Sequence, residues 1–112
     1  MIDIAELADR HLDAARADSH GRSAEVVVHD GELRQSMIAL TAGSSLGEHN
    51  SPNAATLQVV RGRVRVASAD GDVEAGAGQL WVLTHERHSV LAAEDSAFLL
   101  TTVTGLGRPS HG

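Results

Sequence analysis

Histidine is the residue type in this chain best suited to chemistry, because the 112 residues include seven histidines and no cysteine. An imidazole can bind a metal ion or act as a general base near neutral pH. The lack of cysteine excludes disulfides, thiolate nucleophiles and thiolate metal sites, so a metal would need histidine, carboxylate or amide donors. The lack of lysine excludes Schiff-base catalysis, and no serine lies in a nucleophile-elbow motif.

An amphipathic helix is predicted within residues 1–20, ahead of any strand. Asp3 is placed to cap its start, and Gly21 follows shortly after its end. Apolar residues recur there at helical spacing, namely Ile4, Leu7, Ala8, Leu12 and Ala15. We expect this face to pack on the rest of the chain or on a neighbouring subunit.

Short runs rich in valine, leucine and threonine follow from about residue 24, separated by turn signals, and they predict an all-β domain over residues 21–104. The predicted strands are 24–29, 32–41, 55–61, 63–68, 72–74, 79–84, 88–93 and 96–104. So many short strands favour a closed or double-sheet arrangement, because an open sheet would leave long unpaired edges. Residues 105–112 are expected to form a flexible tail.

Side-chain alternation predicts which strand residues share a face. Arg61, Arg63 and Arg65 alternate with smaller residues, which predicts three guanidinium groups on one face of a sheet. Trp81 lies in an apolar run and is expected in the core, with its indole N–H at a ligand as the alternative.

Two stretches of the sequence resemble the two signatures of the cupin family. Residues 40–66 read LTAGSSLGEHNSPNAATLQVVRGRVRV, and residues 78–90 read GQLWVLTHERHSV. The positions that match the signatures are Gly43, His49, Pro52, Gly62, Gly78 and His88. The resemblance implies a jelly-roll barrel, or double-stranded β-helix, preceded here by one helix, and it implies a homodimer.

The departures from the signatures concern the metal ligands. In a typical metal-bearing cupin, three histidines and a glutamate hold iron, manganese, nickel or zinc, and only His49 and His88 carry over to this chain. Ser51 stands at the place of another histidine and Ala55 at the place of the glutamate. His85, three residues before His88, could reach the barrel mouth as a third donor. The other candidates for a third donor are Glu48, Asn50 and Gln58, which strand alternation turns to the other face unless a bulge re-aims them.

The resemblance implies that the barrel binds a small molecule, with a pocket lined by His49, Ser51, Leu57, Val59 and His88. The alternative is a metal-dependent enzyme of the oxygenase, isomerase or decarboxylase type, in which His49 and His88 are metal ligands. A third hypothesis is metal-free catalysis with His49 or His88 as a general base. The remaining histidines are interpreted as incidental, since they lie on the helix, a linker, a strand beside a turn and the tail: His11, His20, His29 and His111.

Charge and composition argue against several other partners. Nine arginines against fifteen acidic residues give a formal net charge of −6, which disfavours nucleic acid and anionic membranes. Trp81 and Phe98 are too few aromatic residues for a base-stacking surface. The first residues carry acidic side chains rather than a basic and then apolar leader, so a cytoplasmic location is expected.

Overall fold

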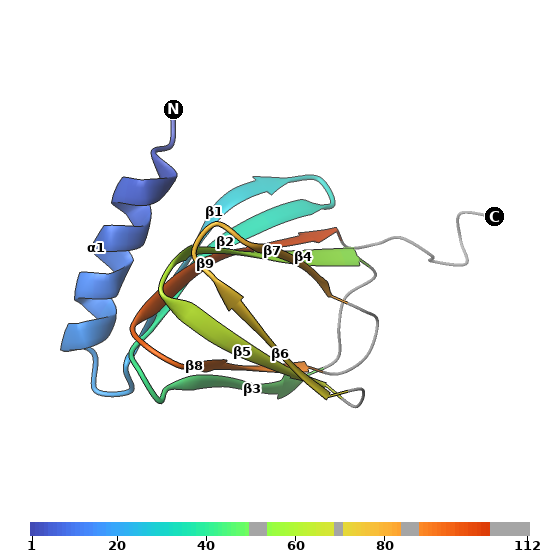
Figure 1. The fold of residues 1–112 in the computed structure, drawn as a ribbon. Helices are drawn as coiled ribbons and strands as arrows, with labels where there is room; N and C mark the ends of the chain where they lie inside the picture. Colours follow the sequence, from blue (N-terminus) through green and yellow to red (C-terminus); the bar gives the residue numbers. More distant parts are fainter. Residues whose placement is uncertain (50–53, 69–70, 84–87, 104–112) are drawn as a thin grey trace.

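The structure, a computed structural model, describes residues 1–49, 54–68, 71–83 and 88–103 (Figure 1). These residues form one helix followed by nine strands. The elements in chain order are α1 (Ile4–Ala17), β1 (Arg22–Asp30), β2 (Leu33–Leu40), β3 (Ser45–His49), β4 (Ala54–Arg61), β5 (Arg63–Ser68), β6 (Gly71–Gly76), β7 (Leu80–Leu83), β8 (His88–Ala92) and β9 (Ser96–Val103). No helix in this part of the chain has the length and apolar character needed to span a bilayer.

The strands form two antiparallel sheets that face each other across the interior. One sheet has the order β1-β2-β9-β4-β7, and the other has the order β3-β8-β5-β6. Because the chain crosses repeatedly from one sheet to the other, strands that follow one another in sequence often lie in different sheets (Figure 1). The predicted all-β jelly-roll architecture with one N-terminal helix is therefore confirmed.

Strand β3 and the arginine stripe differ from the predictions. The run Ser45–His49 was not predicted as a strand, because its glycine and glutamate have low β-propensity. It forms a strand because it pairs with β8. The predicted stripe of three arginines on one face is wrong. Arg61 ends β4 in one sheet, where its Nε donates to Asp9 of α1 at 3.0 Å, whereas Arg63 and Arg65 lie on β5 in the other sheet.

Gly62 joins β4 to β5, and its backbone conformation explains why a glycine stands at this position of the cupin signature. Its φ is +81°, a left-handed conformation that glycine adopts without a Cβ penalty. A Cβ atom there would collide with the carbonyl oxygen of Asp95 and the Oγ of Ser96. Gly43 and Gly78 also have positive φ, +86° and +89°, so all three glycines of the two signatures occupy backbone conformations that other residues avoid.

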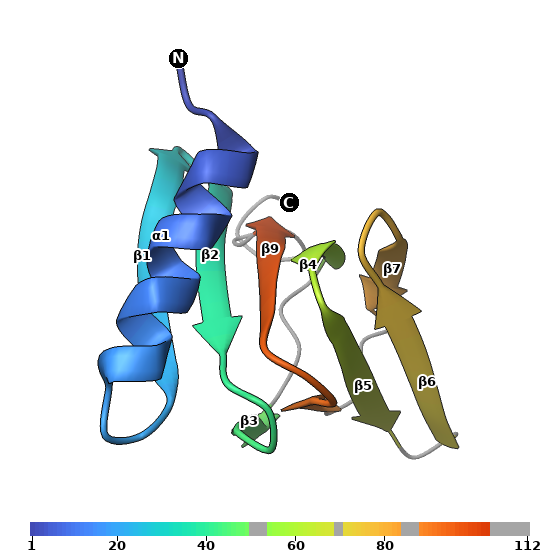
Figure 2. The same cartoon turned by 60° about the vertical axis from the view of Figure 1, so that its left-hand side comes forward.

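Buried side chains form two clusters, one on each side of the five-stranded sheet. The cluster between the sheets contains Ile38, Leu40, Leu57, Val59, Val64, Val66, Ala75, Val90, Ala92 and Phe98. The cluster between α1 and the outer face contains Leu7, Ala8, Leu12, Ala15, Met37, Ala39, Ala97 and Leu99. Figure 2 shows α1 lying along β1 and β2. The helix therefore covers the outside of the barrel and leaves the interior to the strands.

Polar contacts also attach α1 to the sheet. The two ring nitrogens of His11 lie 2.7 Å from Ser23 Oγ and 2.8 Å from Glu25 Oε1, both on β1. Near the other end of the helix, Arg16 Nε donates to Asp95 Oδ2 at 2.9 Å. His11, which sequence reasoning treated as incidental, thus has a structural role.

Candidate functional site

His88 lies inside the barrel at the start of β8. It has the same strand parity as Val90 and Ala92, which belong to the cluster between the sheets. The residue is only 4% exposed. A histidine this deeply buried is shielded from bulk solvent.

The strand register brings His49 and His88 together. The two residues are direct partners across the antiparallel pair formed by β3 and β8. A register irregularity lies between Leu46 and His49, so a bulge or similar distortion precedes this pair. The position of the His49 imidazole lies outside what the structure describes, and Ser51 and His85 lie outside the described residues altogether.

Leu57 and Val59 on β4 point into the barrel, while the intervening Gln58 is exposed on the outer face. This alternation agrees with the parity predicted from the sequence. It also removes Gln58 from the possible metal donors. The lining of a ligand pocket by Leu57 and Val59 stays a prediction, since both are fully packed in the interior cluster.

Trp81 brings a polar atom into the interior. It pairs with Leu57 across β7 and β4 and packs against the interior cluster, whereas its neighbours Leu80 and Val82 face outward and are 59% and 66% exposed. Its indole Nε1 is buried and has no hydrogen-bond partner among the described residues. A buried N–H without an acceptor costs about 1–3 kcal/mol, so this atom marks a place where an acceptor is missing.

The inner face of the barrel changes from apolar to polar toward one end, the end at which β3 and β9 finish and β2 and β8 begin. We call this the polar end. Inner positions change from Leu40 and Ile38 to Ser36 and Arg34 in β2, from Phe98 and Leu100 to Thr102 in β9, and from Ala92 and Val90 to His88 in β8. Small-molecule sites usually combine an apolar lining with a few placed polar groups, and the inner face has both kinds of residue toward this end.

Arg34 and His29 are two residues of the polar end that sequence reasoning missed. They are partners across β1 and β2, and Arg34 Nη2 donates to His29 Nε2 at 3.2 Å. The signal for Arg34 was the alternation in β2, which puts it on the same face as Ile38 and Leu40. His29 was interpreted as incidental, because its partner is known only from the register.

The full set of four family metal ligands does not fit this chain. Among the described residues, no group of three histidine or carboxylate side chains could hold an ion. Ala55, at the place of the glutamate, is 7% exposed and provides only a methyl group. Two imidazoles fall short of the three protein donors that a catalytic metal usually has. The side chain of Glu48 and the whole of Asn50 lie outside the description.

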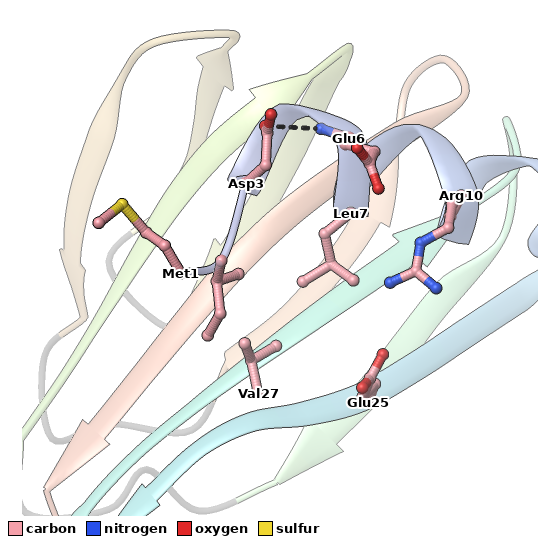
Figure 3. Close-up of a pocket in the computed structure, with 8 residues that line it drawn as sticks. Met1, Asp3, Glu6, Leu7, Arg10, Glu25 and Val27 are labelled. Carbon is pink, nitrogen blue, oxygen red and sulfur yellow. Dashed lines mark hydrogen bonds between the residues drawn. The ribbon is translucent and has the colours of Figure 1, made fainter.

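A groove of about 290 Å³ lies outside the barrel, between the start of α1 and β1. Leu7 and Val27 form its apolar floor, and Arg10 projects toward Glu25 (Figure 3). The helix N-terminus beside it is already capped, because Asp3 Oδ1 accepts the N–H of Glu6 at 3.1 Å. The groove mixes charges of both signs and lies on the opposite side of the five-stranded sheet from His88, so it is separate from the interior site.

Comparisons with known proteins agree with this architecture. No protein-family model matches the sequence, and no curated protein matches it. A cupin superfamily protein from Desulfitobacterium hafniense DCB-2 matches the structure with a TM-score of 0.70 at 12% identity, over 74% of this chain and 77% of that one. KdgF from Halomonas sp. matches with a TM-score of 0.66 at 19% identity, over 85% and 88% of the two chains.

A salicylate 1,2-dioxygenase from Pseudaminobacter salicylatoxidans matches with a TM-score of 0.75 at 18% identity, over 88% of this chain but 33% of that one. The protein therefore has the fold of the cupins: a small jelly-roll barrel of two antiparallel sheets with one N-terminal helix. At identities this low, the likeness defines the fold and not the activity.

Proposed function

We propose that this protein binds a small molecule inside the barrel, at the polar end. The observation that carries the proposal is the buried Trp81 indole N–H, which has no acceptor among the described residues. An oxygen or nitrogen acceptor on a bound molecule would satisfy this donor. His88 faces the same interior from the other sheet and supplies a second polar group.

The floor of the site suits the apolar part of such a molecule. Leu57, the strand partner of Trp81, and Phe98 are fully buried in the interior cluster against which Trp81 packs. Small-molecule sites typically combine such an apolar lining with a few placed polar groups that fix orientation. The lining would thus consist of Trp81, Leu57, Val59 and His88. It would be completed by His49, the last residue of β3, and by Ser51, two residues later in the sequence.

A fragment screen tests this function, because Trp81 is the only tryptophan and its fluorescence reports on the interior alone. Fragments that raise the melting temperature and change this fluorescence are titrated by calorimetry into wild type and Trp81→Phe. The variant keeps a smaller aromatic ring and removes the N–H, so binding should weaken about 5- to 10-fold. Val82→Ala, on the outer face of the same strand, should bind like wild type. Equal affinity in Trp81→Phe and wild type for all bound fragments would contradict the proposal.

A divalent ion held by His49 and His88 is the second candidate, favoured by their direct pairing across β3 and β8. Such an ion would act as a Lewis acid toward a bound oxygen atom. One compared structure is a salicylate 1,2-dioxygenase by name, so the same fold occurs in an oxygenase. Any further donors would come from water, the bound molecule or residues outside the description.

Elemental analysis of protein purified without a histidine tag separates the two candidates. Near-stoichiometric iron, manganese, nickel or zinc that disappears in both His49→Ala and His88→Ala would establish the metal centre and overturn metal-free binding. If no metal is found, and the four metal salts do not raise the melting temperature, the metal-dependent enzyme is excluded. The expected result is no stoichiometric metal, because two imidazoles alone hold a divalent ion poorly.

A further inference from the structure

We propose that the molecule bound in the barrel carries a carboxylate, that Arg34 binds this carboxylate at the polar end, and that His29 positions the guanidinium. This inference rests on the proposed function and adds the chemical class of the ligand. It comes from a residue pair that none of the sequence motifs includes.

Strand register places Arg34 on the inner face of the five-stranded sheet. Arg34 pairs with Thr102 on β9, and Thr102 pairs with Ala55 on β4. Ala55 is buried with the same parity as the interior residue Leu57, so the whole row faces inward. The next inner row contains Leu57 and its partner Trp81, which carries the buried N–H. Arg34 therefore lies at the polar end, one row beyond the apolar floor.

The charge of Arg34 is not neutralised by the described part of the protein. The residue is exposed and makes no ion pair with a described residue, and its guanidinium donates to the Nε2 of His29. Four other arginines do form ion pairs with carboxylates, and these are Arg16, Arg61, Arg63 and Arg65. A guanidinium stays protonated at every physiological pH, so Arg34 is a permanent positive charge at the polar end of a protein with net charge −6.

His29 holds the guanidinium through its Nε2, which accepts the Arg34 N–H at 3.2 Å. A ring nitrogen that accepts must be unprotonated, which puts the proton of the neutral imidazole on Nδ1. Both side chains then offer only N–H donors to a ligand. The neighbouring carboxylate of Asp30 belongs to the opposite face, because side chains alternate along β1. The pair is thus suited to an anion.

A carboxylate fits this pair better than a phosphate does. The planar fork of arginine matches the two oxygens of a carboxylate, and one positive charge balances one negative charge. The backbones of β2 and β7, which carry Arg34 and Trp81, are three strand spacings apart, about 14 Å. The guanidinium of Arg34 leans toward His29 on β1, away from β7, so a ligand that reached both Arg34 and Trp81 would have an acidic head and an extended apolar body.

Matched acid and amide pairs test the carboxylate. Acetate, benzoate and succinate are compared with acetamide, benzamide and succinamide by calorimetry, together with inorganic phosphate. We expect at least one acid to bind ten-fold or more tightly than its amide, and phosphate to bind weakly. In Arg34→Gln the advantage of the acid should disappear while the amide binds as in wild type.

Arg22→Gln is the matched control, because it removes the same charge from an exposed position of the same hairpin, at the other end of β1. It should keep the full preference for the acid. His29→Ala should lower that preference about 2- to 5-fold, and His29→Gln, whose amide oxygen can accept the Arg34 N–H, should restore it. Urea unfolding of each variant establishes that the barrel is intact.

The outcomes distinguish this inference from the function on which it rests. If acids and amides bind equally, or if Arg34→Gln keeps the preference, the carboxylate inference is wrong while binding in the barrel stands. If phosphate binds more tightly than every acid, the ligand class is wrong. If none of the seven molecules binds and the fragment screen also yields no ligand, both proposals fail.

Discussion

Single residues determine how the apolar end of this barrel closes. At the junction of β4 and β5, Ser96 is fully buried and its Oγ accepts the N–H of Arg63 at 2.9 Å. The same Oγ lies 2.7 Å from the carbonyl oxygen of Glu94. Gly62 completes the junction, since its missing side chain leaves room for Ser96 and for the backbone of Asp95.

Gly62→Ala should therefore destabilise the fold through two separate effects. The left-handed backbone costs about 1 kcal/mol for alanine, and the collision with Asp95 and Ser96 adds to it, for a total of about 2–4 kcal/mol in urea unfolding. Gly43→Ala is the control, because its φ is similar, +86° against +81°, and nothing lies within 4 Å of the added Cβ. Equal losses in the two variants would show that the close packing at Gly62 has no energetic role.

Residue patterns predicted the local features of this site well and its long-range partners poorly. The burial of Leu57 and the exposure of Gln58 follow from alternation within one strand. Arg34 pairs with His29 on one side and with Thr102 on the other. Both pairings depend on the register between strands, which a single sequence does not specify. Polar residues that face the interior are therefore recognised only when the neighbouring strands are known.

Among the elements, the helix was predicted almost completely because its information is local. Asp3 caps it as expected, and the buried positions of α1 are apolar residues from the predicted stripe, Leu7, Ala8, Leu12 and Ala15. Strand β3 was missed because its pattern is weak and its stability comes from pairing with β8.

Asp95 connects three elements, and its charge should make their attachment sensitive to acid. Its Oδ1 accepts the backbone N–H of Ala42 at 2.8 Å, and its Oδ2 accepts Arg16 Nε of α1. The Ala42 hydrogen bond, followed by that of Arg16, lowers the pKa of Asp95 below its usual 3.8. A lowered pKa in the folded state stabilises the fold above the ordinary pKa, and the contribution is lost as the pH falls through the folded value.

Asp95→Asn should consequently lower the free energy of unfolding at pH 7 and have a progressively smaller effect as the pH falls below 3.8. Urea unfolding of variant and wild type across pH 2 to 7 measures the difference. Asp13→Asn is a suitable control, because Asp13 also contacts Arg16 but is 82% exposed and ties no loop to the helix. A difference between wild type and Asp95→Asn that stays constant with pH would contradict the role of the carboxylate charge.

In the whole molecule, the two ends of the barrel differ in polarity, and the two faces of the five-stranded sheet pack against different elements. The helix occupies the outer face of the five-stranded sheet (Figures 1 and 2). The apolar end of the barrel is closed by tight turns, and the polar inner residues lie at the other end. The net charge of −6 would repel an anionic ligand at long range, so the local charge of Arg34 must supply its attraction. Homodimer formation and a cytoplasmic location stay predictions from the sequence.

The central claim, that the barrel interior receives a ligand, is tested most directly by the indole cross-peak of Trp81 in a ¹H–¹⁵N spectrum. The chain has one tryptophan, so this signal is unambiguous and belongs to the buried N–H. Titration with fragments that bind by calorimetry is predicted to move the cross-peak in a saturable way for at least one of them, as the N–H gains an acceptor. A cross-peak that stays unmoved while calorimetry records binding would place the ligand elsewhere and contradict the account.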